Sequence, residues 1–332
     1  MPIKTPKFWY RPQSSSAPLI EQLLTPFSAL YRIGQNMNLN TQQTKSVEIP
    51  VICIGNITAG GNGKTPTIIA LHKLLIKHGL FKSPYFLSRG YGGSESQTRC
   101  IEVHDDAKFV GDEPLLLASH SKTIISVNRY YGAKLMHDLG ADCVLMDDGF
   151  QNTSLQKDIS LLIIDGKTGF GNRKLIPSGP LREPIDAAFQ RAQAVLIIGE
   201  DKTNVTSLIP AHMTVLKASI QVQDNLVLKK EQPYIAFAGL GHPQKFHDTL
   251  KQGDMNIIAF HEFADHHPYS QKDINALLHE AKQTNAKLLT TEKDYQRITR
   301  DLRDNIDVFP IELVWENEDN VIAFLKKELK EA

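Results

Sequence analysis

The sequence has few cysteines, no excess of charge of either sign and no long apolar run. Its cysteines, Cys53, Cys100 and Cys143, stand singly, so neither a disulfide framework nor a zinc site with paired ligands is expected. Basic and acidic residues both number 37, a balance that does not favour nucleic acid as a partner. No apolar run reaches the roughly 18 residues of a membrane-spanning helix, and no signal peptide is expected because an apolar core with a cleavage site is missing.

Short apolar runs alternate with helical stretches between residues 50 and 200. The runs that predict strands are Val51–Ile54, Tyr85–Leu87, Thr123–Val127, Cys143–Met146, Ser160–Ile164 and Ala194–Ile198. Continuous apolar strands between helices are typical of a parallel sheet covered on both faces. The 332 residues are enough for about two domains, and we expect the first to be an α/β domain.

The most informative motif is a glycine-rich loop after the first of these strands. It consists of Thr58, Ala59, Gly60, Gly61, Asn62, Gly63, Lys64 and Thr65, and an amphipathic run follows it. Such a loop presents backbone N–H groups and a helix N-terminus to phosphate. Lys64 would reach the outer phosphates and Thr65 would hold Mg²⁺. Thr58 departs from the pattern G-x-x-x-x-G-K-[ST], and Gly60-Gly61 would supply the tight turn instead. We predict that residues 58–65 bind the phosphates of a nucleotide.

Two groups of acidic residues are candidates for the chemistry. Asp147 and Asp148 end an apolar strand, and adjacent carboxylates are costly to bring together without a cation. We expect this pair to bind Mg²⁺ together with Thr65. Asp112 stands between Gly111 and Pro114, where it either caps a helix or supplies an acid at the mouth of the active site.

Three further loops carry candidate residues. The loop 88–93 is glycine-rich, and the loop 177–184 contains Arg182, whose planar fork can neutralise phosphate charge. Both would emerge at the same edge of the sheet as the phosphate loop. In the second half of the chain, Asp265 precedes His266 and His267. A histidine oriented by a carboxylate is a usable general base, although a polar surface loop is the alternative.

The two ends of the chain differ from this pattern. Near the N-terminus, the aromatic cluster Phe8-Trp9-Tyr10 precedes apolar residues at helical spacing around Pro26. This segment either lies in a membrane surface or packs on its own domain. Two extended runs flank Gln223-Asp224-Asn225 and predict a two-stranded linker. We therefore predict a membrane-contacting segment (1–36), a P-loop kinase domain (37–213), the linker (214–233) and a smaller C-terminal α/β domain (234–332).

In combination, these motifs resemble those of the tetraacyldisaccharide 4'-kinase (lipid A 4'-kinase) family. The resemblance rests on residues 55–66, 87–92, 110–114, 147–151, 179–184, 263–266 and 291–294, in the expected order. It implies a P-loop NTPase-like, mostly parallel sheet with helices on both faces, joined by a two-stranded linker to a smaller α/β domain. It also implies that the enzyme transfers the γ-phosphate of ATP, with Mg²⁺, to the 4'-hydroxyl of a tetraacylated glucosamine disaccharide 1-phosphate. The product would be lipid IVA, an intermediate of lipid A biosynthesis.

The resemblance also assigns roles and a location. The catalytic acid of the family maps onto Asp112 and its catalytic histidine onto His266, with His267 as the alternative; Lys64 and Arg182 would assist. The enzyme would be a peripheral or monotopic protein at the cytoplasmic face of the inner membrane, contacted through the N-terminal segment. Two alternatives remain from the residues themselves: a phosphate-loop kinase or GTPase with a soluble substrate, and a nucleotide-switched binding protein. The candidate acid and histidine argue against the second, because a switch needs no general base.

Overall fold

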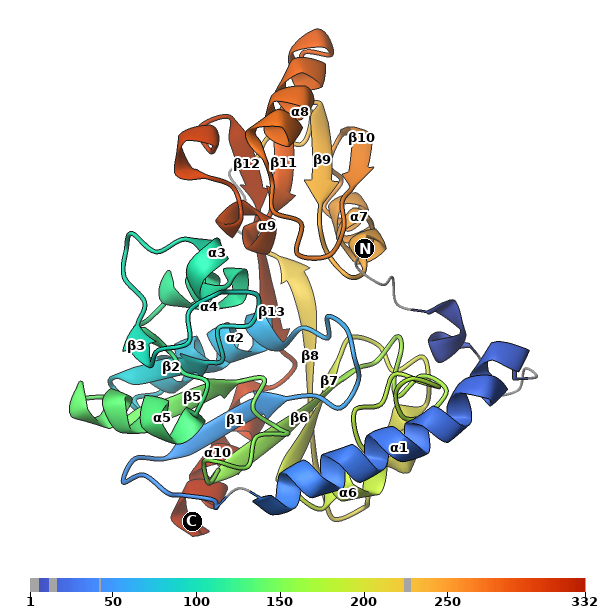
Figure 1. Cartoon of the computed structure of the whole chain (residues 1–332). Helices are drawn as coiled ribbons and strands as arrows, with labels where there is room; N and C mark the ends of the chain where they lie inside the picture. The colour runs from blue at the N-terminus through green and yellow to red at the C-terminus, as the bar shows by residue number, and fades with distance from the viewer. Residues whose placement is uncertain (1–5, 12–16, 42, 224–227, 332) are drawn as a thin grey trace.

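A nine-stranded sheet forms the core of the larger part of the molecule (Figure 1). The computed structural model describes residues 6–11, 17–41, 43–223 and 228–331. The sheet order is β13-β8-β7-β6-β1-β5-β2-β4-β3, and neighbouring strands are parallel except at the two edges, where β13 and β3 run antiparallel to their neighbours. The strands are β1 (Val51–Gly55), β2 (Pro84–Ser88), β3 (Arg99–Cys100), β4 (Thr123–Ile125), β5 (Cys143–Asp147), β6 (Ile159–Asp165), β7 (Ala194–Ile198), β8 (Thr214–Val222) and β13 (Ile311–Trp315).

Helices cover both faces of this sheet because its central strands are buried on both sides. Even-numbered residues of β1, such as Ile52, pack with α2 and α10, whereas odd-numbered residues, such as Cys53, pack towards α5. The helices of this part are α1 (Leu19–Thr41), α2 (Lys64–Lys77), α3 (Ala107–Val110), α4 (Asp112–Ala118), α5 (Arg129–Asp138), α6 (Ile185–Phe189) and α10 (Glu318–Glu331), with 3-10 turns η1 (Lys7–Tyr10) and η2 (Val205–Leu208).

A second, smaller sheet lies above the carboxyl edge of the first (Figure 1). Its order is β10-β9-β11-β12 and all of its strands are parallel. The elements are β9 (Tyr234–Ala238), α7 (Pro243–Gln252), β10 (Ile257–Glu262), α8 (Gln271–Gln283), β11 (Lys287–Thr291), α9 (Glu292–Gln296), η3 (Arg300–Leu302) and β12 (Ile306–Phe309). The predicted strands at 234, 257 and 287 are present, whereas β12 was not predicted.

The linker differs from the predicted hairpin. Strand β8 pairs antiparallel with β13, from Ala218 opposite Trp315 to Val222 opposite Ile311, so its partner comes from almost 90 residues further along the chain. Asp224 and Asn225 of the predicted turn lie outside the described residues. The two connecting strands are therefore the outgoing and the returning passages of the chain, which are too distant in sequence to be recognised as a local turn.

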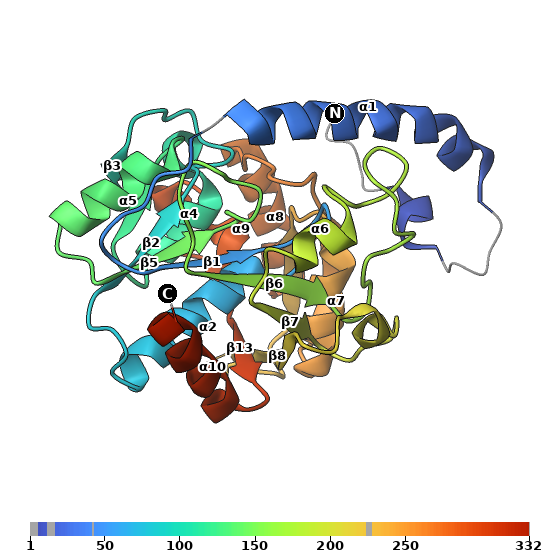
Figure 2. The ribbon, with the colours of Figure 1, turned by 90° about the horizontal axis from the view of Figure 1, so that it is seen from below.

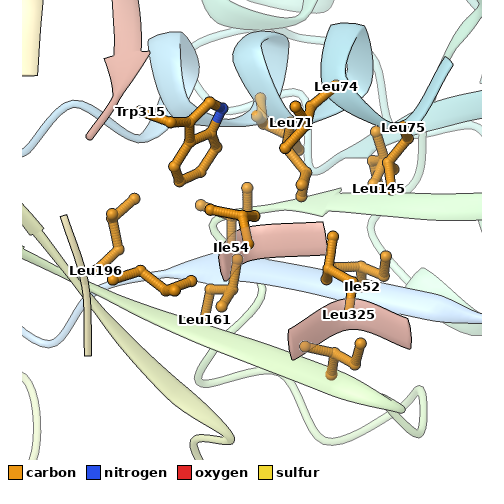
Figure 3. Packing of buried hydrophobic residues seen from close by; sticks show 14 of the residues in the cluster. Ile52, Ile54, Leu71, Leu74, Leu75, Leu145, Leu161, Leu196, Trp315 and Leu325 are labelled. Atoms are coloured by element: carbon orange, nitrogen blue, oxygen red, sulfur yellow. The ribbon is translucent and has the colours of Figure 1, made fainter. Parts of the chain in front are cut away.

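The C-terminal helix belongs to the larger part of the molecule rather than to the predicted C-terminal domain. Leu325 of α10 is fully buried in the same cluster as Ile52, Ile54 and Leu161 (Figure 3), and Trp315 of β13 joins them. The predicted boundary of 234–332 is therefore wrong at its C-terminal end. The physical reason is that α10 buries its apolar face against β6 and β8.

Shortening Leu325 to alanine tests this packing. We expect Leu325→Ala to lower the free energy of unfolding of the large domain by about 2–5 kcal/mol, because a fully buried leucine leaves a cavity. Lys326→Ala, on the exposed side of the same helix, is the control and should change it by less than about 0.5 kcal/mol. Equilibrium denaturation measures both, and equal stability of the two variants would contradict the assignment.

Helix α1 crosses the outside of the face that carries α6, whereas α2 and α10 lie on the opposite face (Figure 2). It continues through Pro26 as one helix. Among the described residues, no helix is both long and apolar enough to cross a bilayer.

Candidate active site

The phosphate loop connects β1 to α2 at the carboxyl edge of the sheet. Gly63 has a φ of 80° and forms the N-cap of α2, and a Cβ there would lie 2.9 Å from Ile198 Cδ1, so only glycine fits without rearrangement. Lys64 is the first residue of the helix; its Nζ lies 3.3 Å from Asn56 Oδ1 and 3.6 Å from Asp148 Oδ2. The loop thus aims its lysine at Asp148, beside the end of β5.

Two predicted phosphate-binding residues, Thr58 and Ala59, do not line the cleft. The lining of the adjoining cleft runs from Gly60 to Thr65 and does not include Thr58 or Ala59. Thr58 is buried, and its Oγ1 accepts a hydrogen bond of 2.6 Å from Asn62 Nδ2, while its carbonyl accepts one of 2.8 Å from Asn56 Nδ2. Threonine at position 58 therefore holds the loop from below, a contact that glycine could not make.

The strand-end carboxylates suit a Mg²⁺ ion. Asp147 ends β5, next to β1 in the sheet; its Oδ1 is buried without a hydrogen-bond partner, and Asp148 and Thr65 line the same cleft. Among the described residues there is no cluster of three or more histidine, cysteine or acidic side chains that would hold a metal alone. This fits Mg²⁺, which protein sites hold through one or two carboxylates together with substrate phosphates.

The pKa values of the two neighbouring aspartates are shifted in opposite directions. Burial, together with Glu113 and Asp148, raises the pKa of Asp147 to about 7. Burial also acts on Asp148, but Lys64 and Arg182 outweigh it and lower the pKa of that carboxyl. The cations near Asp147 therefore do not offset its burial, whereas Asp148 has both Lys64 and Arg182 as cationic neighbours.

Arg182 joins this group from the loop 177–184. Its Nη1 lies 3.2 Å from each oxygen of the Asp148 carboxylate and 3.4 Å from Gln151 Oε1. The loop is held in place because the Arg182 N–H donates to the carbonyl of Ile57, directly beneath the phosphate loop. Arg182 therefore faces the predicted phosphate site, as expected from the shared edge of the sheet.

The candidate acid and histidine meet across the two sheets. His266, in the loop after β10, lies with Nδ1 3.0 Å from Asp112 Oδ2, and Asp112 is only 3% exposed. Gly111 rather than Asp112 is the N-cap of α4, so the capping alternative does not account for this burial. His267 points elsewhere, with Nε2 3.2 Å from Asp273 of its own domain. His266 lines the cleft and is held there by buried Asp112, whereas His267 Nε2 lies beside Asp273.

Cations surround Asp112 from the second domain. Arg297 Nε lies 3.1 Å from Asp112 Oδ2 and Lys293 Nζ lies 4.0 Å from it, while Lys293 also donates to Glu113 at 2.9 Å. Burial raises the pKa of Asp112, but the hydrogen bond with His266 and these cations lower it to about 2, so the carboxyl stays ionised at neutral pH. Arg297 was not predicted from the sequence. The pattern that could have indicated it is its spacing of three residues from Asp294, with which it forms an ion pair of 2.6 Å.

All these groups line or border one cleft of about 1750 Å³ between the two sheets. Tyr91, from the glycine-rich loop after β2, packs edge-on against His266 with ring centroids 5.8 Å apart. The cleft is large enough for a nucleotide and part of a second substrate. Phosphate-binding groups thus lie on one wall and a candidate base on the other, which is the arrangement that phosphoryl transfer to a hydroxyl requires.

Helix α1 presents an unusual surface on the α6 face of the large sheet (Figure 2). Its inner face is polar: buried Glu21 pairs with Arg11 at 2.8 Å and with Lys174 at 3.0 Å, and Ser28 Oγ donates to the Leu175 carbonyl. Its outer face is apolar, with six residues between 53% and 72% exposed: Leu19, Ile20, Leu23, Phe27, Leu30 and Ile33. A solvent-facing apolar stripe on a helix that is docked through polar contacts is the reverse of the usual surface helix.

Comparisons with known proteins agree with this geometry. A family profile described as tetraacyldisaccharide-1-P 4'-kinase matches residues 20–330. The tetraacyldisaccharide 4'-kinase of Paramagnetospirillum magneticum is 42% identical over 95% of both chains, and that of Rhodospirillum centenum is 38% identical over 97% of this chain and 96% of its own. The crystal structure of LpxK from Aquifex aeolicus in complex with ATP has a TM-score of 0.77 and 26% identity, and covers 93% of this chain and 99% of that one. With matches over nearly its whole length, and with the resemblance in its motifs confirmed, the chain belongs to the tetraacyldisaccharide 4'-kinase family.

Proposed function

We propose that the cleft transfers the γ-phosphoryl group of ATP to the 4'-hydroxyl of a tetraacylated glucosamine disaccharide 1-phosphate, giving lipid IVA in lipid A biosynthesis. The observation that carries this is the juxtaposition of the His266–Asp112 pair, 3.0 Å apart, with a phosphate loop across one cleft. Membership of the kinase family supplies the acceptor class. The alternative, a phosphate-loop enzyme with a soluble substrate, is disfavoured because relatives that match this chain over nearly its full length are named for the acylated disaccharide.

The donor half of the reaction lies on the phosphate loop. Backbone N–H groups of Gly60 to Thr65 and the N-terminus of α2 bind the phosphates, and Lys64 reaches the transferred group. Arg182 offsets charge that develops on the equatorial oxygens during transfer. Because phosphoryl transfer depends on positioning and electrostatics, preformed contacts such as Lys64 to Asn56 reduce the reorganisation that the reaction needs.

The acceptor half lies on the opposite wall. When Asp112 accepts the Nδ1–H of His266, the ring nitrogen Nε2 is free to take the proton of the sugar hydroxyl. The ionised Asp112 then stabilises the imidazolium that forms, and Arg297 and Lys293 hold Asp112 in place. His266 therefore activates the attacking oxygen, and Asp112 sets the orientation of the ring.

A Mg²⁺ ion would be held by Asp147, Asp148 and the Thr65 hydroxyl. Its chemistry is the neutralisation of charge on the β- and γ-phosphates. Lys64 and Arg182 lower the pKa of Asp148 and so keep this carboxylate ionised. The Oδ1 atom of Asp147 is buried and has no hydrogen-bond partner, so it is available as a ligand. The donor set thus fits a hard, oxygen-preferring cation.

A radiolabel-transfer assay tests the proposal. With γ-labelled ATP, we expect label to appear on the detergent-dispersed tetraacylated disaccharide 1-phosphate and not on a soluble sugar or nucleoside. Transfer to the soluble acceptor alone would favour a soluble-substrate kinase. ATP that remains unconsumed in the presence of the glycolipid would favour a nucleotide-switched binding protein.

The surface of α1 supports a peripheral or monotopic contact with a membrane. That this membrane surface is the cytoplasmic face of the inner membrane is what the family resemblance implies. The six exposed apolar residues of its outer face form a stripe that can enter the acyl boundary, while its inner face docks on the enzyme through Glu21 and Ser28. The two alternatives for this segment are therefore compatible, since one face packs on the protein and the other is left for lipid. An enzyme acting on a lipid acceptor gains access to it in this way.

A charge on this stripe should weaken membrane association. Phe27→Glu is expected to reduce partitioning into anionic vesicles by about ten- to a hundredfold, because a phenylalanine contributes about 1.5–3 kcal/mol when buried in an apolar phase. Ile76→Glu is the control, since Ile76 is similarly exposed, at 46%, on α2 of the opposite face. Vesicle sedimentation measures both variants. Equal partitioning of Phe27→Glu and the parent would exclude α1 as the membrane contact.

A further inference from the structure

Two aromatic residues before α1 contact the protein rather than solvent or lipid. Trp9 Nε1 donates to the Pro177 carbonyl at 3.0 Å, and the Trp9 carbonyl accepts a hydrogen bond of 2.7 Å from the Asn172 N–H. Tyr10 follows, and its hydroxyl donates to the carbonyl of Ala59 at 3.0 Å. The aromatic cluster, which was predicted to contact a membrane, therefore reaches Ala59 at the start of the phosphate loop.

The contact with Ala59 acts on a specific peptide group. The carbonyl of Ala59 and the N–H of Gly60 belong to one planar peptide unit and point in opposite directions. A hydroxyl that holds the carbonyl on one side therefore fixes the direction of the Gly60 N–H on the other. Gly60 is the first residue of the loop that lines the cleft, and N–H groups in such loops are what bind phosphate.

The second domain contacts the Gly61–Asn62 peptide of the same loop, two peptides further along. Lys245 Nζ, in the first turn of α7, donates to the Gly61 carbonyl at 3.2 Å and pairs with Asp165 at 2.5 Å. His242 packs edge-on against Tyr10 with ring centroids 6.0 Å apart. A Cβ on Gly60 would lie 3.3 Å from His242 Nε2 and 3.8 Å from the Tyr10 hydroxyl. Gly60 is therefore enclosed between the N-terminal segment and the second domain.

We propose that Tyr10 is a positioning residue for the donor nucleotide, which it serves by orienting the Ala59–Gly60 peptide of the phosphate loop. The proposal rests on the assignment of residues 60–65 to the phosphates of ATP. Burial, with a contribution from Asp165, raises the pKa of Tyr10 to about 12, so the hydroxyl remains a donor throughout the physiological range. The next residue, Arg11, pairs with buried Glu21 of α1, so the membrane-facing helix and the nucleotide site are joined through one short segment.

Removal of a single oxygen tests the proposal in the full-length enzyme. Tyr10→Phe should raise the Kd and the KM for ATP about two- to tenfold, as expected for one hydrogen bond. It should leave kcat at saturating ATP and the KM for the glycolipid within twofold of the parent. Tyr131→Phe, the same change at a tyrosine that is 54% exposed on α5, is the matched control and should alter neither constant.

The outcomes separate this inference from the proposed function. If the parent binds ATP and Tyr10→Phe binds it equally well, or if only the KM for the glycolipid changes, the positioning role is overturned while the kinase proposal stands. If the parent does not bind ATP, the proposed function fails first. Isothermal titration without the lipid substrate gives the Kd, and steady-state assays give the separate KM values.

Discussion

Replacing His266 is expected to lower the rate of phosphoryl transfer by about 10²–10⁴, the usual contribution of a positioned general base. Its Nδ1 lies 3.0 Å from buried Asp112, whose pKa of about 2 keeps it ionised and able to stabilise the imidazolium. Residual activity should remain, because the phosphate loop would still position ATP and stabilise the transferred group.

The choice of variants must distinguish the loss of the general base from backbone strain that a substitution at His266 causes in the loop after β10. His266 has a φ of 55°, a region that asparagine tolerates better than alanine, so His266→Asn is the primary variant and His266→Ala the second. His267→Ala is the control, since His267 is adjacent but contacts Asp273. Steady-state kinetics should show a fall in kcat for both His266 variants with little change in the KM for ATP. Full activity of His266→Asn together with loss in His267→Ala would assign the base to His267 instead.

Replacing Lys64 should lower kcat/KM by about 10²–10³ and also weaken ATP binding. Its ammonium group lies between Asn56 and Asp148, at 3.3 and 3.6 Å, and in the proposed mechanism it would meet the outer phosphates as charge develops on them. Without it, Asp148 would keep Arg182 as a partner but lose one of the charges that lower its pKa. Both ground-state binding and the transition state are therefore affected.

Separate measurements distinguish the two effects. Titration calorimetry should give a higher Kd for ATP in Lys64→Ala, and single-turnover kinetics at saturating ATP should give a lower rate. Lys64→Arg should restore little activity, because the planar guanidinium is bulkier and differently directed than the ammonium at a site where the lysine side chain is only 11% exposed. Lys82→Ala, an exposed lysine outside the cleft, serves as the control. Unchanged kcat in Lys64→Ala would place the γ-phosphate elsewhere.

Local patterns predicted the parts of the fold that depend on neighbouring residues. Apolar runs identified strands such as β1 and β5, because a strand buried on both faces needs a continuous apolar sequence. The glycine-rich run 58–65 followed by an amphipathic run predicted a loop that leads into a helix, and α2 begins at Lys64. Asp147 at a strand end and the loop that carries Arg182 were expected at the edge where the phosphate loop emerges, since the carboxyl ends of parallel strands meet at one edge.

Contacts between distant segments were not predictable in this way. The pairing of β8 with β13 and the burial of Leu325 join residues about 90 to 270 positions apart, and no local signal marks such partners. The same is true of Arg297, which reaches Asp112 only because the second domain folds over the first. Each of these depends on which surfaces bury one another rather than on the period of a single segment.

The amino-acid sequence alone established the phosphate loop, the α/β architecture of the first domain and, through its motifs, the kinase family, because these depend on short runs of adjacent residues. Only the tertiary structure decided which histidine faces Asp112, that Thr58 supports the loop from beneath, and that Tyr10 reaches Ala59 while the apolar side of α1 faces outward. The physical reason is that these roles are distances and directions between side chains, and these are set by packing between elements that are far apart in the chain.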